Sequence, residues 1–141
     1  MSWNKIISHA GWNGGVEFWQ FDTNDDGSDK MINKKDGNRI NDLKYIGLLL
    51  DDVLVTSSDW TADEVWIGIQ DRRVLVYNID VGEEDKELKP YLLAEWKNLR
   101  GTVLSLKCNE VLDIAVATTS SGSVNLLSIK KSEYKSFSPP F

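Results

Sequence analysis

Two polar stretches of this 141-residue chain contain residue types that could bind an ion or a charged partner. The first, 22–27 (D-T-N-D-D-G), matches the start of a calcium-binding loop, in which alternate oxygen ligands converge on a hard cation. Lys30 stands at the ninth position of that motif, where it would repel the ion, and Asn33 replaces the glutamate expected at the twelfth. We therefore expect a solvated polar loop here and no metal site.

The second stretch, Asp71-Arg72-Arg73, lies where a tight turn is predicted. Two adjacent arginines on an exposed turn could bind a carboxylate or phosphate of a partner through paired hydrogen bonds. Alternatively, the turn is solvated and Asp71 pairs locally. Trp12 lies beside another predicted turn, where it could anchor a protein interface or pack between sheets. Asp71, Arg72, Arg73 and Trp12 are therefore the candidate partner-binding residues.

Residues that could support catalysis do not form a recognisable set. His9 is the only histidine, and its neighbour Ser8 would point to the opposite face of a strand, so the two do not form a nucleophile–base pair. Cys108 is the only cysteine and is expected to be a small core residue. Without a second histidine or a Cys-x-x-Cys pair, a transition-metal centre is not expected. We predict no catalytic residue, no cofactor and no enzymatic activity.

The elements that would position these residues form a repeated pattern. A strand, a polar turn and a second strand occur without a gap at 5–21, 63–79 and 113–129. The aligned apolar positions of the second strand are Val16, Val74 and Val124, then Phe18, Val76 and Leu126, then Trp19, Tyr77 and Leu127. Each copy is predicted to be a β-hairpin. The spacing between copies is close to the roughly 40–50 residues of one blade of a β-propeller.

Further strands are predicted between the hairpins. The segment 22–42 is a polar insertion, whereas 43–57 is apolar and is interpreted as two strands or one bulged strand. Strands are also predicted at 91–96, 102–107 and 134–137. An outer strand, an inner strand and the following hairpin would form one four-stranded unit. The first unit lacks the strands that should precede its hairpin.

The strand after each turn resembles that of the WD40-repeat β-propeller family, which commonly reads V-x-Φ-W-D. The matching stretches are 16–20 (VEFWQ), 74–78 (VLVYN) and 124–128 (VNLLS). The resemblance implies an all-β fold, a partial β-propeller of about three four-stranded blades with the first incomplete, and docking of proteins or peptides. The Gly-His dipeptide of the family is missing, so its Asp–His–Ser/Thr–Trp hydrogen-bonded tetrad cannot be assembled from this sequence.

Three hairpins predict an unfinished ring, because a propeller needs about 4–8 blades to close. We therefore expect a single all-β domain over 1–141 that is the C-terminal part of a longer propeller, or that is completed by another chain or by copies of itself. The remaining alternative is a compact sandwich or barrel in which the repeat has no structural meaning.

The composition of the chain restricts the classes of partner it could bind and the cellular compartment in which we expect it. The net charge is −6 and the pI is near 4.7, which opposes binding to a phosphate backbone. The single cysteine fits a reducing compartment, and the sequence has no long apolar run. We expect a soluble cytoplasmic or nuclear protein that binds protein partners, without direct contact to nucleic acid or membrane.

The predicted function is a non-catalytic protein–protein interaction scaffold, acting as a propeller subunit or as part of a larger complex. The alternative is a ligand-binding β domain that holds carbohydrate in a shallow groove of exposed tryptophans. The tryptophans considered for that groove are Trp3, Trp12, Trp60, Trp66 and Trp96.

Overall fold

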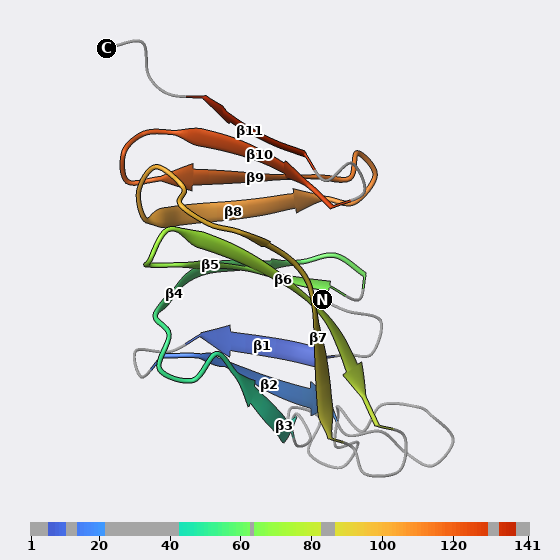
Figure 1. The fold of residues 1–141 in the computed structure, drawn as a ribbon. Helices are drawn as coiled ribbons and strands as arrows, with labels where there is room; N and C mark the ends of the chain where they lie inside the picture. The colour runs from blue at the N-terminus through green and yellow to red at the C-terminus, as the bar shows by residue number, and fades with distance from the viewer. Residues whose placement is uncertain are drawn as a thin grey trace, which may run out of the picture.

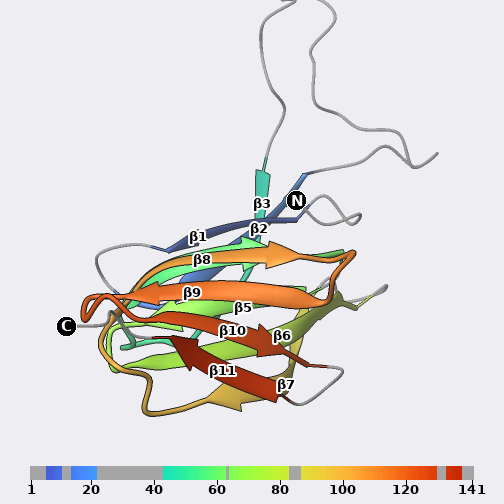
Figure 2. The same cartoon turned by 90° about the horizontal axis from the view of Figure 1, so that it is seen from above.

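The computed structural model describes residues 6–10, 14–21, 43–62, 64–82, 87–129 and 133–137. These ranges contain eleven strands, which form three antiparallel sheets stacked one above another (Figure 1). Seen from above, the strands of successive sheets overlie one another (Figure 2). The described part of the chain has no helix of the length and apolarity needed to cross a membrane.

Each sheet is built from strands that are consecutive in the chain. The first sheet has the order β1 (Ile6–Ala10), β2 (Val16–Phe21), β3 (Leu43–Leu49). The second sheet has the order β4 (Val55–Trp60), β5 (Glu64–Ile69), β6 (Arg73–Val81), β7 (Leu88–Trp96). The third sheet has the order β8 (Val103–Asn109), β9 (Ile114–Thr119), β10 (Val124–Ser128), β11 (Glu133–Phe137). The topology is therefore a meander within every sheet.

The three predicted hairpins are present as β1–β2, β5–β6 and β9–β10, and they pair in equivalent registers. The equivalent opposite residues are Ala10 and Val16, Gly68 and Val74, and Thr118 and Val124. The predicted make-up of the unit is wrong in one respect. The strand expected to open the third unit, at 91–96, belongs to β7 and pairs with β6 in the second sheet. Each outer strand therefore completes the hairpin that precedes it.

Among the described strands, the first sheet consequently lacks only the inner strand that β4 and β8 supply to the other two. The apolar segment 43–57 is divided between β3 in the first sheet and β4 in the second. Left-handed backbone at Leu50 (φ 57°) and Asp52 (φ 69°) turns the chain between them. Pro90 is accommodated within β7 because that strand lies at a sheet edge, where a missing N–H is tolerated.

Two apolar cores hold the stack together. The first lies between the first and second sheets and includes the buried side chains of Phe18 and Ile67. The second lies between the second and third sheets and includes those of Val76 and Leu127. Because burial of one large apolar side chain contributes about 1.5–3 kcal/mol, these two layers supply the driving force for stacking.

Each of the two cores contains a tryptophan at an equivalent contact between sheets, but the strand that supplies the tryptophan differs. Trp60 of β4 approaches Ser8 of β1, and its Nε1 donates a hydrogen bond to Ser8 Oγ at 2.8 Å. One sheet further on, the position of Ser8 is taken by Trp66 of β5, and that of Trp60 by the small Cys108 of β8. The large ring comes from the inner strand in one core and from the hairpin in the other. A small residue on the opposing strand leaves room for it in each case.

Candidate interaction rim and open sheet faces

Turns at one end of the three sheets form a continuous band, which we call the turn rim. It consists of 14–15, 50–54, 70–73, 97–102 and 120–123. The main-chain hydrogen bonds between these turns are Gly15 N to Val53 O (2.7 Å), Gln70 N to Leu54 O (3.0 Å), Leu99 N to Arg72 O (3.1 Å) and Ser120 N to Thr102 O (2.8 Å). The rim is therefore one connected surface that crosses all three sheets.

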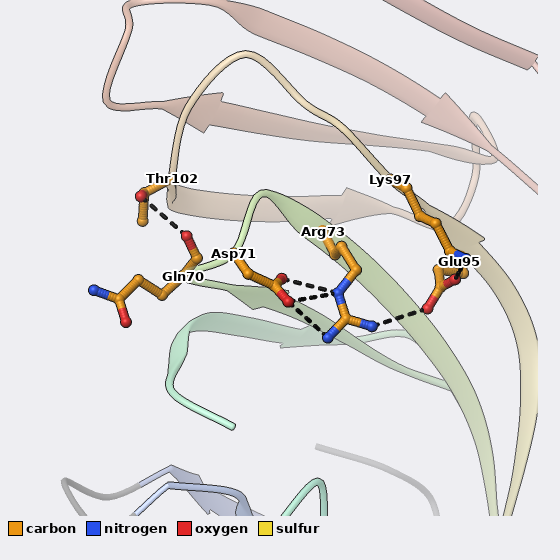
Figure 3. Close-up of polar contacts among 6 residues, drawn as sticks. All are labelled: Gln70, Asp71, Arg73, Glu95, Lys97 and Thr102. Atoms are coloured by element: carbon orange, nitrogen blue, oxygen red, sulfur yellow. Dashed lines mark hydrogen bonds and ion pairs between the residues drawn. The ribbon is translucent and has the colours of Figure 1, made fainter. Parts of the chain in front are cut away.

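Arg73, the first residue of β6, is held by two carboxylates, that of Asp71 on the rim and that of Glu95 on β7 (Figure 3). Its Nε donates to both carboxylate oxygens of Asp71 at 2.9 Å, and its Nη1 donates to Glu95 Oε2 at 3.2 Å. Lys97 Nζ lies 3.2 Å from the other oxygen of Glu95. The hydrogen bond with Asp71 raises the pKa of the Arg73 guanidinium above its usual value. Arg73 is thus engaged within the chain, and Asp71 pairs locally.

Arg72 is arranged differently from its neighbour. Its side chain is exposed and has no hydrogen-bond or ion-pair partner in the described ranges. Its backbone is left-handed, with φ 69°, a conformation that costs a non-glycine residue roughly 1–2 kcal/mol. The hydrogen bond from Leu99 N to Arg72 O helps to hold that conformation. The turn therefore presents one of its two arginines to solvent.

Hydroxyl groups at the third sheet form hydrogen bonds to main-chain carbonyl groups of the rim. Thr119 Oγ1 donates to Arg100 O at 2.7 Å, and Ser121 Oγ donates to the same carbonyl oxygen. Thr102 Oγ1 reaches back to the preceding sheet and donates to Gln70 O at 3.1 Å (Figure 3). These bonds join the β9–β10 turn, the β7–β8 loop and the β5–β6 turn. No histidine takes part in them, in contrast to the Asp–His–Ser/Thr–Trp tetrad.

A cleft of about 230 Å³ lies at the opposite end of the second and third sheets, and acidic residues line part of it. Each carboxylate there accepts a hydrogen bond from another part of the chain. Thr61 Oγ1 donates to Glu64 Oε1 at 2.8 Å, and Ala62 N donates to Glu110 Oε1 at 3.0 Å. Among the described residues, no group of three or more His, Cys, Asp or Glu is placed to hold a metal ion.

Cys108 also lines this cleft, and its thiol is not a nucleophile at neutral pH. Burial, together with the nearby carboxylates of Asp59 and Glu64, raises the pKa of Cys108 to about 12. The thiol is therefore protonated at neutral pH. It is unreactive in that form, because only the thiolate attacks an electrophile.

Two sheet faces are uncovered in the described chain. The C-terminal open face is the side of the third sheet away from the second, and it presents Val116, Thr118, Val124 and Leu126. The N-terminal open face is the side of the first sheet away from the second, and it presents Ile7, His9, Glu17, Trp19, Tyr45 and Leu48. The two faces differ in chemistry, because the first presents apolar residues and threonine whereas the second also presents His9 and Glu17.

The candidate residues from the sequence have different outcomes. Asp71, Arg72 and Arg73 lie together on the turn rim. Trp12 and the calcium-like stretch 22–33 lie outside the described residues, so both stay sequence predictions. Glu95 was missed, although its alternation with Lys97 in a predicted strand region could have suggested paired charges on one face.

Comparison with protein-family models found no match, and comparison with curated proteins found none either. Solved structures do match. The C-terminal WD40 domain of Sif2 superposes with a TM-score of 0.64 and 14% identity, covering 96% of this chain and 35% of that one. The WD40 domain of Toxoplasma gondii coronin superposes with a TM-score of 0.61 and 20% identity, covering 96% of this chain and 31% of that one.

The class of fold follows from these observations. Three stacked antiparallel meanders with a shared turn rim are consecutive blades of a β-propeller. The propeller is WD40-like, partial, and has an incomplete first blade among the described strands. The chain spans about a third of the length of each of the two matched chains.

Proposed function

We propose that this chain is a non-catalytic protein–protein interaction scaffold that works as part of a larger propeller or complex in the cytoplasm or nucleus. The observation that carries the proposal is the C-terminal open face. Its pairs, Thr118 with Val124 and Val116 with Leu126, repeat the registers of the two faces that are covered by a neighbouring sheet. The corresponding residues of the covered faces include Val16, Phe18, Val74 and Val76, all 0% exposed.

Apolar residues of the C-terminal open face are more exposed than the residues at the same positions of the other two sheets. Val124 is 38% exposed, whereas its equivalents Val16 and Val74 are fully buried. A contiguous apolar sheet face of this kind marks a surface that binds another protein surface. A further propeller sheet fits best, whether it comes from another chain or from another segment of the same protein.

The turn rim supplies a second, polar contact surface in this proposal. Arg72 is exposed and unpaired among the described residues, and Arg73 is fixed beside it by Asp71 and Glu95. Arg73 already uses its donors within the chain, so the exposed guanidinium of Arg72 is the one that can pair with a carboxylate of a partner. We assign Arg72 as the rim residue that contacts an acidic partner segment, with Asp71 and Arg73 as its support.

The covering of the C-terminal open face is tested by the association state of the 141-residue chain. Light scattering after gel filtration should show species larger than the 16.0 kDa monomer as concentration rises, because exposed apolar faces associate. Val124→Lys should shift the chain toward the monomer. The matched control Val111→Lys changes a turn residue that is already 93% exposed and should behave as the wild type. A wild-type chain that stays monomeric at every concentration contradicts the proposal.

The role of the rim requires the identified partner. Mass spectrometry of proteins that co-purify with the full-length protein gives candidates, and binding is then measured by calorimetry. Arg72→Ala should weaken binding by about 1.5 kcal/mol, the value of a hydrogen bond to a charged group. Lys89→Ala removes the same charge from the edge strand β7, away from the rim and from both open faces, and serves as the control. Equal loss in both variants would exclude a specific role for Arg72.

The structure does not favour the carbohydrate-binding alternative. Trp66 is 3% exposed and stacks on Trp96 with ring centroids 5.5 Å apart. Trp60 is half-buried, contacts the Phe18 ring edge-on and uses its Nε1 to bond Ser8. The expected groove of exposed tryptophans is therefore wrong for these three residues, while Trp3 and Trp12 lie outside the described ranges.

A further inference from the structure

The centre of the N-terminal open face differs from the equivalent position in the other sheets. In the second sheet this position holds the buried apolar pair Ile67 and Leu75. In the third sheet it holds Ala117 and Asn125, also buried, and Asn125 Nδ2 donates to Ala117 O at 3.1 Å. A polar residue is thus accepted there when its hydrogen bonds are made within the fold.

In the first sheet the same central position holds His9 opposite Glu17. His9 Nδ1 lies 3.9 Å from Glu17 Oε2, which is longer than a hydrogen bond, and the side chains are 69% and 47% exposed. His9 therefore pairs with the Glu17 carboxylate only through charge and only when its imidazole is protonated, and it donates no hydrogen bond to it. Covering the carboxylate with an apolar sheet would bury a charge without a hydrogen-bonded partner, which is strongly unfavourable.

Aromatic and aliphatic side chains surround this carboxylate. Trp19 follows Glu17 by two residues on the same face of β2, and it meets Tyr45 edge-on with ring centroids 5.3 Å apart. Leu48 lies opposite Glu17 on β3. Tyr45 is 49% exposed and Leu48 is 40% exposed, so the patch is accessible in the described structure.

We propose that the N-terminal open face binds an arginine side chain carried by an extended segment of a protein partner. The guanidinium pairs with the Glu17 carboxylate and its plane lies over Trp19. Two residues along a strand span about 6.6 Å, so one arginine can contact both groups. Arginine fits better than lysine because its planar fork pairs with carboxylates and also stacks on aromatic rings. The net charge of −6 adds a general attraction for a basic segment.

This inference rests on the proposed interaction role and specifies the partner chemistry at one of the two open faces. It concerns the first sheet, whereas the association test with Val124→Lys concerns the third. The two can therefore fail independently, and each result is assigned to its own face.

The experiment uses the tripeptide acetyl-Ala-Arg-Ala-amide and the ¹H–¹⁵N spectrum of the 141-residue chain. The peptide should shift the Trp19 indole N–H signal, whereas the citrulline analogue, neutral and of the same shape, should shift it much less. Glu17→Gln should raise the dissociation constant for the arginine peptide about two- to fivefold, as expected for an exposed ion pair. Glu110→Gln removes the same charge from the β8–β9 turn and should leave the constant unchanged.

Three outcomes would overturn the inference. The citrulline peptide could bind as tightly as the arginine peptide, which would exclude charge recognition. Glu17→Gln could bind as the wild type does, which would exclude the ion pair. The shifts could map to Glu110 and the acidic cleft instead of Trp19, which would place the cation elsewhere. Because Glu17 is an exposed strand residue, the variant should retain the wild-type circular dichroism spectrum.

Discussion

Replacing Gly68 by alanine should weaken the contact between the second and third sheets. A Cβ added at Gly68 would lie 2.5 Å from Val103 Cγ1 and 2.5 Å from Ser57 Oγ. Non-bonded carbon atoms are best separated by about 3.5–4.0 Å, so the new methyl group overlaps Val103 by about 1 Å. Val103 is 0% exposed and cannot turn into solvent. The two sheets must therefore move apart or distort.

Two effects of opposite sign set the magnitude. Overpacking a buried site by one methyl group costs about 1–3 kcal/mol. Alanine also restricts the unfolded chain relative to glycine, which stabilises the fold by about 0.4–1 kcal/mol. The steric term is larger, so Gly68→Ala should lower the free energy of unfolding by about 1–2 kcal/mol.

Urea unfolding monitored by circular dichroism measures this loss, and a double-mutant cycle tests its cause. Val103→Ala removes both γ-methyl groups, including the one that the new Cβ would meet, while the contact with Ser57 Oγ remains, so Gly68→Ala should cost less but not nothing in that background. The interaction between the two changes should be at least about 0.5 kcal/mol. An unchanged stability in Gly68→Ala, or the same penalty in both backgrounds, would refute close sheet contact at this position.

Two further predictions concern the same inter-sheet contacts. Ser8→Ala removes the acceptor of the Trp60 Nε1 hydrogen bond and should cost about 1–3 kcal/mol in urea unfolding, whereas the exposed Ser58→Ala should be neutral. Burial raises the pKa of Cys108 from an ordinary 9.0 to about 12, so the folded state keeps its proton where the unfolded state loses it. That contribution to stability is present below pH 9.0 and lost as the pH rises toward 12, so the wild type should lose more stability over this interval than Cys108→Ala. Equal pH profiles would contradict the buried thiol.

Hairpins could be predicted because both of their determinants are local. Alternating apolar residues set the strands, and short polar turns set the register, so Val16, Val74 and Val124 occupy equivalent places in the structure. The division of 43–57 into two strands could be proposed for the same reason. The left-handed residues Leu50 and Asp52 show where the chain turns between them.

Pairing between more distant strands could not be predicted in the same way. The periodicity at 91–96 identifies a strand but does not say whether it pairs with the hairpin before it or the strand after it. In the structure β7 pairs with β6, and its edge position also explains how Pro90 is tolerated. The rim contacts of Arg73 were equally hidden, because Glu95 approaches it across that same pairing.

The contacts of Trp60 and Trp66 explain why the repeats match so weakly in sequence. An inter-sheet contact is determined by the combined volume of two side chains from different repeats, not by either residue alone. Ser8 with Trp60, and Trp66 with Cys108, fill equivalent places with the large residue on opposite partners. The side chain that fits at such a position therefore depends on the residue facing it from the neighbouring repeat, so the sheets can pack without a shared signature in every repeat. The same logic applies to the N-terminal open face, where Glu17 replaces an apolar residue and is compatible only with a neighbour that brings the complementary charge.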